Sequence, residues 1–272
     1  MQRTVVKSAS RTLEVLELFS EKRRPLRLIE IYQSLNCPQS SATNLLKSMV
    51  TMGYLNYNRS MRTYLPTAKV GAMGNWLSSS MYGETRYHEL VDTLQKRTDE
   101  TAALSTQNDL FIQYFIIKTP QHEFKMPPSE GSMRLMTKST SGMALMSRMT
   151  DRQVDKLCRH INYYELGPDS RVDIREVMKE LAWIRKVGYC YIEHRPVLGI
   201  SSLAFPLGET LHGIPLALGV GGVHDRIASR KAEIVATIRE TIAEFKRQPV
   251  EDDTDHTPKS AKLNIREMAA VA

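Results

Sequence analysis

The segment from Leu28 to Lys47 constrains the fold most, because it predicts two short helices joined by a tight turn. In each half, apolar side chains recur at the i, i+3, i+4 and i+7 spacing that gives a helix one buried face. Between the halves lie Asn36, which tolerates unusual backbone angles, and Pro38, which suits the first turn of a new helix. Residues 28–47 therefore predict a helix-turn-helix.

The second predicted helix carries short polar, amide and cationic side chains outside its apolar face. Those expected nearest to DNA bases are Gln39, Ser40, Thr43 and Asn44, and those expected nearer to phosphates are Ser41 and Lys47. Side chains of these types read base edges and contact phosphates. The alternative is an ordinary helical hairpin whose polar face is only solvated.

Positive charge is concentrated around this motif. Residues 1–80 hold 11 lysines and arginines against 4 glutamates, a net charge of +7, whereas the rest of the chain has equal numbers of acidic and basic side chains. A basic segment beside a neutral majority is typical of proteins that neutralise nucleic-acid phosphates. Binding to an anionic membrane would call for a basic amphipathic helix, and the sequence shows none.

Two short stretches of alternating polarity follow the second helix and predict a β-hairpin. They span residues 54–57 and 63–65, and the loop between them carries Arg59 and Arg62, which we expect near phosphates. A further helix is expected upstream, at about 10–20, with Leu13, Leu16 and Phe19 facing inward. Residues 5–66 are therefore predicted to form a winged helix-turn-helix domain.

Residues 8–77 resemble the DNA-binding domain of the IclR family of bacterial transcriptional regulators. The resemblance runs without a gap through LNCPQSSATNLLKSMVTMGYL. Two later segments resemble the effector domain of that family: GSMRLMTKSTSGMALMSRM and IRKVGYCYIEHRPVLGISSLAFPL. The second segment shares the G-Y…G-x-x-x-x-A-x-P pattern of that domain. The resemblance implies a repressor or activator whose ligand domain adjusts operator binding, often as a dimer of dimers.

The resemblance also implies a small-molecule cavity in the second domain. The corresponding residues are Thr140, Ser141, Ile192, Ile200, Ser202, Gly219 and Gly221. The family often has an acidic residue where Ile192 stands and hydroxyl groups at the two glycines, so this cavity should be less polar than one that binds small oxo-acids. Arg134, Lys138 or His194 could meet a carboxylate. We therefore expect an aromatic or bulkier organic acid as the effector, or no ligand at all.

Two departures from the family concern the DNA-binding domain. Asn44 stands where a basic residue is usual, so amide readout, for which adenine is the natural partner, replaces a phosphate or guanine contact. Arg27 stands where a helix-capping hydroxyl is frequent, which leaves the start of the first motif helix open.

Residues 67–81 predict a helix that links the two domains. Val70, Met73 and Leu77 form an apolar stripe along it, with Trp76 beside them. In a two-fold dimer this stripe could pack against its symmetry mate and set the spacing of the two recognition helices, which a palindromic operator would mirror. The alternative is that the stripe packs only within its own chain.

Residues 82–247 predict an effector-binding domain that resembles GAF and PAS sensor modules, with an antiparallel sheet flanked by helices. Helices are expected at about 86–98, 141–148, 151–160, 174–187 and 227–247. Strands are expected at about 102–106, 110–118, 133–137, 189–192, 201–207 and 214–220. The fold class is therefore α+β, and the domain is large enough to enclose a ligand.

Patterns for catalysis, metals and cofactors are weak. Cys158 and His160 lie two positions apart on a predicted helix and face different ways, which argues against a nucleophile–base pair. The histidines lack metal-ligand spacing, and the glycines at 219–222 lack the spacing of a dinucleotide loop, so no metal or cofactor is expected.

The unpaired cysteines and the lack of a signal peptide or long apolar run predict a cytoplasmic protein with reduced thiols. The polar residues 248–272 are expected to be mostly disordered.

The leading hypothesis is a sequence-specific transcriptional regulator that is not an enzyme. Its expected partners are double-stranded DNA, a small-molecule effector and further copies of itself, as a homodimer or a dimer of dimers. Two alternatives stay open. One is a ligand-independent architectural DNA binder, which would bind no metabolite, and the other is an enzyme with a DNA-binding module, which would turn over a bound compound.

Overall fold

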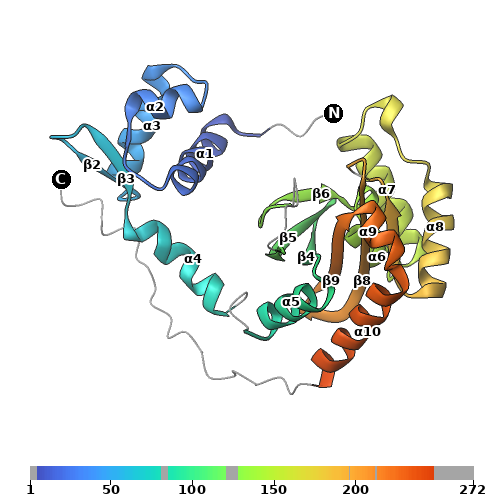
Figure 1. Ribbon diagram of the computed structural model, residues 1–272. Coiled ribbons are helices and arrows are strands. Elements are labelled where there is room, and N and C mark those ends of the chain that lie inside the picture. Colours follow the sequence, from blue (N-terminus) through green and yellow to red (C-terminus); the bar gives the residue numbers. More distant parts are fainter. Residues whose placement is uncertain (1–4, 81–84, 121–127, 196, 212, 248–272) are drawn as a thin grey trace.

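The computed structural model describes residues 5–80, 85–120, 128–195, 197–211 and 213–247. It contains an N-terminal unit with a three-stranded sheet, a linking helix, and a C-terminal unit built on a six-stranded sheet (Figure 1). The predicted α+β class, with an N-terminal winged helix-turn-helix, is confirmed. Three predicted segments lie outside the described residues: the disordered tail at 248–272, the last linker residue, 81, and the first residues of the effector-binding domain, 82–84.

The N-terminal unit packs three helices against three short strands within its described residues. Along the chain these elements are α1 (Lys7–Lys22), β1 (Leu26–Arg27), α2 (Leu28–Ser34), α3 (Gln39–Thr51), β2 (Leu55–Asn58) and β3 (Thr63–Pro66). The strands pair antiparallel in the order β1-β3-β2. Their shared core includes Val15 of α1, Ile31 of α2 and Leu46 of α3, and it holds α2 and α3 together as the helix-turn-helix.

Local interactions define the turn and the start of α2. Asn36 adopts a positive φ of 45°, and α3 begins directly after Pro38, as predicted. At the start of α2, the Glu30 carboxylate accepts the backbone N–H of Arg27 at 2.9 Å. Half of a capping box therefore forms without a hydroxyl at position 27, and α2 begins at Leu28.

Two features of the N-terminal unit differ from the sequence expectation. Leu13, expected to face inward, is 61 % exposed, whereas Val15 is fully buried. Successive residues of a helix are about 100° apart, so these two side chains point to nearly opposite sides, and the core selects the Val15 side. Strand β1 was not predicted, because it forms only through the pairing of Leu26 with Tyr64, which is distant in sequence.

Helix α4 (Ala68–Ser80) follows the wing and coincides with the predicted linker helix. Of the predicted apolar stripe, Val70 is half-buried and Met73 is 57 % exposed. The exposed methionine leaves part of this stripe uncovered within the chain.

The C-terminal unit has helices on both faces of an antiparallel sheet. Its helices are α5 (Thr85–Thr98), α6 (Thr140–Met146), α7 (Asp151–Tyr164), α8 (Ile174–Val187), α9 (His224–Ser229) and α10 (Lys231–Arg247), and short 3-10 helices span Met136–Lys138 and Pro168–Ser170. Its strands are β4 (Thr101–Asn108), β5 (Phe111–Lys118), β6 (Met133–Leu135), β7 (Cys190–Glu193), β8 (Ile200–Leu211) and β9 (Ile214–Val223). The strand order is β6-β5-β4-β9-β8-β7, and all neighbours are antiparallel.

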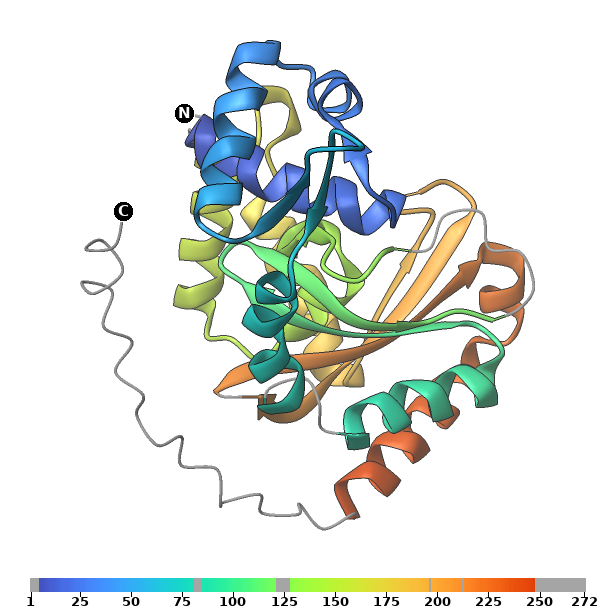
Figure 2. The same ribbon diagram turned by 90° about the vertical axis from the view of Figure 1, so that its left-hand side faces the viewer.

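Alternation along the strands divides the side chains between two cores. Helices α5, α9 and α10 cover one face, where Leu203 and Leu218 are buried, and α5 and α10 lie side by side there (Figure 2). Helices α6, α7 and α8 cover the other face, where the central strands contribute the small residues Ala204 and Ala217. Small side chains on this second face allow α6 to approach the sheet closely.

The helix expected at 227–247 is two helices that meet at Arg230. The backbone of this residue leaves the helical region, and its guanidinium donates a hydrogen bond of 3.0 Å to the carbonyl of Thr98 at the end of α5. The break therefore depends on a contact with a distant part of the chain, which helical periodicity cannot indicate.

Candidate DNA-binding surface and ligand cavity

Helix α3 presents its polar residues on the side opposite the core. Gln39, Ser40, Asn44 and Lys47 are exposed, and Ser41 and Thr43 are half-buried. The hydroxyl of Thr43 donates to the Gln39 carbonyl at 2.8 Å, so its proton is used within the helix. No acidic residue occurs on α3, and its outer face is therefore neutral to positive, as DNA binding requires.

The hairpin formed by β2 and β3, residues 55–66, is the wing. Arg59 and Arg62 are exposed at its turn, and Arg62 adopts a positive φ of 54°. The Oδ1 atom of Asn58 accepts the backbone N–H of Met61 at 3.1 Å. This side-chain bond stabilises the turn in one conformation and keeps both arginines beside its tip.

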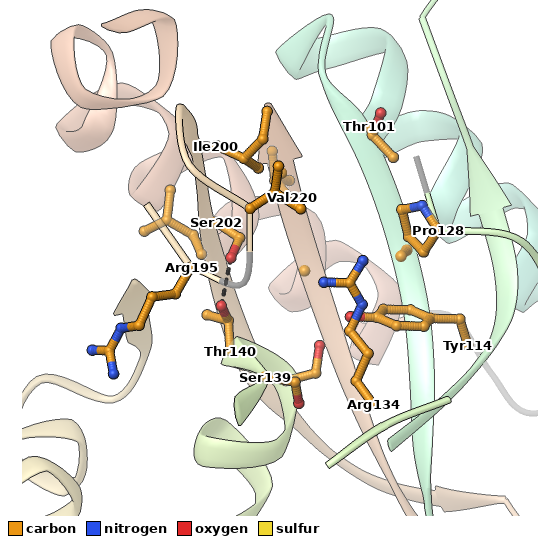
Figure 3. A pocket seen from close by; sticks show the side chains of 16 residues that line it. Thr101, Tyr114, Pro128, Arg134, Ser139, Thr140, Arg195, Ile200, Ser202 and Val220 are labelled. Carbon is orange, nitrogen blue, oxygen red and sulfur yellow. Dashed lines mark hydrogen bonds between the residues drawn. The ribbon is translucent and has the colours of Figure 1, made fainter. Parts of the chain in front are cut away.

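A cavity opens on the face of the C-terminal sheet that carries α6, α7 and α8 (Figure 3). It is lined by Thr101, Ala103, Tyr114, Pro128, Arg134, Ser139, Thr140, Ser141, Arg195, Val197, Ile200, Ser202, Leu203, Gly219, Val220 and Gly221. The cavity has a volume of about 80 Å³ and opens to solvent through its mouth.

Small residues of the central strands create this space. Ala103 of β4 lies opposite Gly219 of β9, and Gly221 lies opposite Ser202 of β8. A Cβ atom at Gly219 would lie 3.0 Å from the carbonyl oxygen of Leu203, so the backbone itself leaves little room for a side chain there. Larger residues at these positions would fill the cavity.

Hydroxyl groups cluster on one side of the cavity. The side chains of Thr140 and Ser202 are hydrogen-bonded to each other, from α6 and β8 respectively (Figure 3). Nearby, the Ser139 hydroxyl accepts the backbone N–H of Gly142 at 2.9 Å and caps α6. The Thr140–Ser202 pair uses one hydroxyl proton for its own bond, and the other is available to a polar group of a ligand.

Arg134 and Tyr114 point into the other side of the cavity (Figure 3). Arg134 lies on the edge strand β6, and no carboxylate of the described residues forms a salt bridge with it. Burial raises the pKa of Tyr114, and the Arg134 charge offsets only part of this effect, so the phenol stays protonated at neutral pH. A guanidinium without an acidic partner beside a phenol donor is suited to an anionic ligand group.

Most of the residues expected in the cavity line it. They are Arg134, Thr140, Ser141, Ile200, Ser202, Gly219 and Gly221. Ile192 and His194, which were also expected there, do not line it. Ile192 lies on the edge strand β7 and is buried in the core beneath α6, α7 and α8, and His194 is exposed with its ring packed on His224, centroids 4.0 Å apart. Lys138 also lies outside the cavity.

The tertiary structure adds cavity residues that the sequence did not indicate. Tyr114 and Ala103 line the cavity because β4 lies between β5 and β9, and this strand order is not visible in the sequence. Alternation places Tyr114 on the same face as Ile112, but only the fold shows that α6 covers this face. Arg195 also lines the cavity, although its guanidinium points away from it (Figure 3) and lies 3.9 Å from Glu180.

The described residues hold no metal-binding cluster, and the thiol of Cys158 is not activated. Among them, no group of three or more His, Cys, Asp or Glu side chains could hold a metal ion. Burial raises the pKa of Cys158 to about 11, so its thiol is not activated as a nucleophile at neutral pH. In this same part of the chain, no helix has the length and apolar character needed to cross a membrane.

Two family models match the chain, one on each side of α4. Residues 8–59 match the IclR helix-turn-helix domain, and residues 84–246 match the C-terminal domain of bacterial transcriptional regulators of the IclR type. The chain belongs to the IclR family. As an IclR-family transcriptional regulator, it combines a DNA-binding helix-turn-helix domain with an effector-binding C-terminal domain, and the family consists of regulators rather than enzymes.

Several IclR-family proteins are similar to this chain along most of its length. The transcriptional repressor IclR of Escherichia coli (strain K12) is 23 % identical over 236 residues, which cover 82 % of each protein. The crystal structure of the Thermotoga maritima IclR has a TM-score of 0.68 at 18 % identity and covers 89 % of this chain and 98 % of that one. An IclR homolog from Microbacterium hydrocarbonoxydans, crystallised with 4-hydroxybenzoate, has a TM-score of 0.64 at 17 % identity and covers 88 % and 97 %. Both structures share the fold of this chain.

Proposed function

We propose that this IclR-family regulator binds a palindromic operator as a homodimer or a dimer of dimers, and that an organic acid with one aromatic ring alters its operator affinity. The observation that supports the ligand class is the Arg134 guanidinium, which faces a small cavity without a carboxylate partner among the described residues. A cation held in such a site is most stable when an anion completes it.

In the proposed DNA complex, α3 lies in the major groove. Asn44 is exposed on its outer face, where its amide can form two hydrogen bonds to an adenine. Because the Thr43 hydroxyl donates to the helix backbone, Thr43 offers its methyl group and an acceptor oxygen to the bases. Gln39 and Ser40 complete the base-reading set, and phosphates are neutralised or bound by Ser41, Lys47, Arg59 and Arg62.

In the proposed ligand complex, the carboxylate binds Arg134 and Tyr114. The ring lies over the small residues Ala103 and Gly219, where a flat group meets no side chain. A polar substituent on the far side of the ring reaches the Thr140–Ser202 hydroxyl pair. The 4-hydroxybenzoate bound by the Microbacterium homolog has both functional groups, and it is therefore the first probe to test.

The proposed dimer forms through the apolar stripe of α4, part of which is exposed at Met73. Two recognition helices related by a two-fold axis would read half-sites about one helical turn of DNA apart. A ligand changes operator affinity only if it binds the DNA-competent and DNA-incompetent arrangements unequally.

We place the functional boundaries at residues 5–66, 67–81 and 82–247, and limited proteolysis should cut between them.

The DNA-binding proposal is tested by selecting genomic fragments with the purified full-length protein and titrating salt against the best-bound site. We expect a recurring palindrome bound at least about 10³-fold more tightly than random DNA, and affinity that falls steeply with salt. Uniform binding to all fragments would instead indicate an architectural DNA binder, and the operator proposal would be wrong.

The ligand proposal needs its own measurement. Isothermal titration of benzoate, 4-hydroxybenzoate and the uncharged 4-hydroxybenzamide into the protein should show binding of an acid and much weaker binding of the amide. An acid that binds should also change the affinity for the selected site. Equal binding of acid and amide, or binding of none of the three, would contradict the proposed ligand class.

A further inference from the structure

An open groove in the DNA-binding domain lies between the start of α2 and the turn of the wing. Its lining includes Arg24, Arg27, Gln39, Ser60, Met61 and Arg62. Gln39 is the first residue of the recognition helix, and Met61 lies in the turn of the wing. The groove therefore connects these two structures, and a duplex seated on the start of α3 also meets the tip of the wing.

The charge of this groove selects a polyanion as its occupant. Its acidic residue, Glu30, already pairs with Arg24 at 2.6 Å. Arg59 and Arg62, on the two sides of the wing tip, form no salt bridge with any carboxylate of the described residues. Double-stranded DNA, which carries a regular array of phosphates, is complementary to such a surface.

Between the two arginines, the wing tip exposes an apolar side chain. Met61 is 62 % exposed, while Arg59 and Arg62 are exposed beside it. If the wing tip contacted only phosphates, the apolar thioether side chain of Met61 would have no partner there. In proteins that bind the minor groove, methionine and other apolar side chains insert between base steps, while neighbouring cations contact the strands.

The wing holds Met61 in a defined position. Asn58 Oδ1 accepts the Ser60 hydroxyl at 2.8 Å and the Met61 N–H at 3.1 Å. Below the turn, the rings of Tyr57 and Tyr64 pack across the strands with centroids 4.7 Å apart. Since the turn is already ordered, insertion of its tip into DNA loses little conformational entropy.

We propose that Met61 acts as a wedge that enters the minor groove beside the recognition helix, partly unstacks one base step and bends the operator. Arg59 and Arg62 contact the phosphates on both sides of this step. The inference rests on the proposed operator binding. It further implies that the step is a pyrimidine–purine step, because TA and CA/TG steps unstack most easily.

The test uses the full-length protein and the duplex that it selects most strongly from a random-sequence library. One set of duplexes carries the fluorescent base 2-aminopurine, placed at a different position in each duplex. The fluorescence of 2-aminopurine rises when this base unstacks. A second set carries terminal dyes that report bending by energy transfer. With the wild-type protein we expect increased emission at one step near the wing and a bend of about 20–90°.

Three variants distinguish insertion of Met61 between bases from a surface contact with the DNA. Met61→Ala should lose the local emission and most of the bend, with a loss of affinity of about tenfold or less. Met61→Leu should retain both signals, because it keeps an apolar side chain of similar size. Met52→Ala is the matched control, since Met52 is 59 % exposed at the other end of α3, and it should change neither signal.

The outcomes distinguish this inference from the proposal on which it rests. If selection enriches no sequence, the operator proposal itself fails. If a duplex is enriched but stays straight and stacked, or if Met61→Ala bends and unstacks it as the wild type does, the wedge is overturned while sequence-specific binding stands.

Discussion

The Nζ atom of Lys69, in the first turn of α4, donates a hydrogen bond of 2.9 Å to the carbonyl of Met52, the C-cap of the recognition helix. The same ammonium lies 4.4 Å from the centre of the Tyr54 ring. Thr67 adds a second connection, because its hydroxyl donates to the Gly53 carbonyl at 2.7 Å. These contacts join the start of the linker helix to the end of α3, so a reorientation of α4 that preserves them also moves the helix that faces the DNA.

The first prediction concerns this joint. Lys69→Met removes a cation that caps the negative end of α3, and we expect the free energy of unfolding of the N-terminal domain to fall by about 0.5–1 kcal/mol. Urea denaturation followed by circular dichroism measures the change. Lys7→Met, at the opposite, N-terminal end of a helix, is the control and should cause no loss. Equal stability of the Lys69 variant and the wild type would show that the joint contributes nothing.

The second prediction separates base contacts from phosphate contacts on α3. Asn44→Ala should remove about 1–3 kcal/mol of discrimination at one base pair of the selected site. Lys47→Ala should weaken binding to all sequences alike and reduce the slope of log K against log salt by about 1. Binding measured on the selected site, on its single-base variants and on random DNA at several salt concentrations decides between them. Identical behaviour of the two variants contradicts the assigned roles.

The third prediction concerns the cavity. Arg134→Met should weaken the binding of the tightest benzoate-type acid by about 10- to 100-fold, because a hydrogen bond to a charged group is worth about 1.5–3 kcal/mol. Arg195→Met provides a matched control, since this arginine also lines the cavity but its guanidinium points away from it. Isothermal titration measures both variants. If both lose affinity equally, the acid binds through overall charge and not through Arg134.

The fourth prediction concerns the close approach of α6 to the 3-10 turn before it. A Cβ atom at Gly142 would lie 2.1 Å from the Met136 carbonyl oxygen and 2.6 Å from its Cα. Because backbone atoms must shift to make room, Gly142→Ala should lower the free energy of unfolding by about 1–3 kcal/mol. Gly167→Ala, where a Cβ atom meets nothing within 4 Å, should be neutral in the same denaturation measurement. If Gly142→Ala left the free energy of unfolding unchanged, α6 would be able to shift without a loss of stability.

The fifth prediction concerns alkaline pH. Burial raises the pKa of Cys190 to about 12. The unfolded chain therefore releases this thiol proton at a lower pH than the folded chain does. The stabilisation is complete below the thiol's ordinary pKa and is lost progressively as the pH rises from about 9 towards 12, by about 1.4 kcal/mol per pH unit.

Urea denaturation of the wild type and of Cys190→Ala at pH 8 and pH 10 tests this dependence. Other groups titrate in the same range, so the comparison rests on the difference between the two proteins. We expect the wild type to lose about 1 kcal/mol more than the variant over this interval. The same pH dependence in both would refute the role of the Cys190 thiol.

Elements with local signals can be predicted from the amino-acid sequence alone. Spacing of apolar residues located α2, α3 and the linker helix, since a helix is built from contacts between residues three and four positions apart. Asn36 and Pro38 marked the turn between α2 and α3 through their own backbone preferences. The excess of positive charge required no structure at all, and it indicated a nucleic-acid partner.

Features that depend on contacts between distant segments are visible only in the folded chain. Leu26 forms β1 because Tyr64 lies beside it, and Arg230 ends α9 with its side chain bound to Thr98. The cavity includes Tyr114 and excludes Ile192 although the two lie on the same face of the sheet, because Tyr114 belongs to β5 beside the cavity and Ile192 to the far edge strand. Period-two alternation gives the face of a residue, but strand order is set by backbone hydrogen bonds between segments far apart in the chain, and these leave no local pattern.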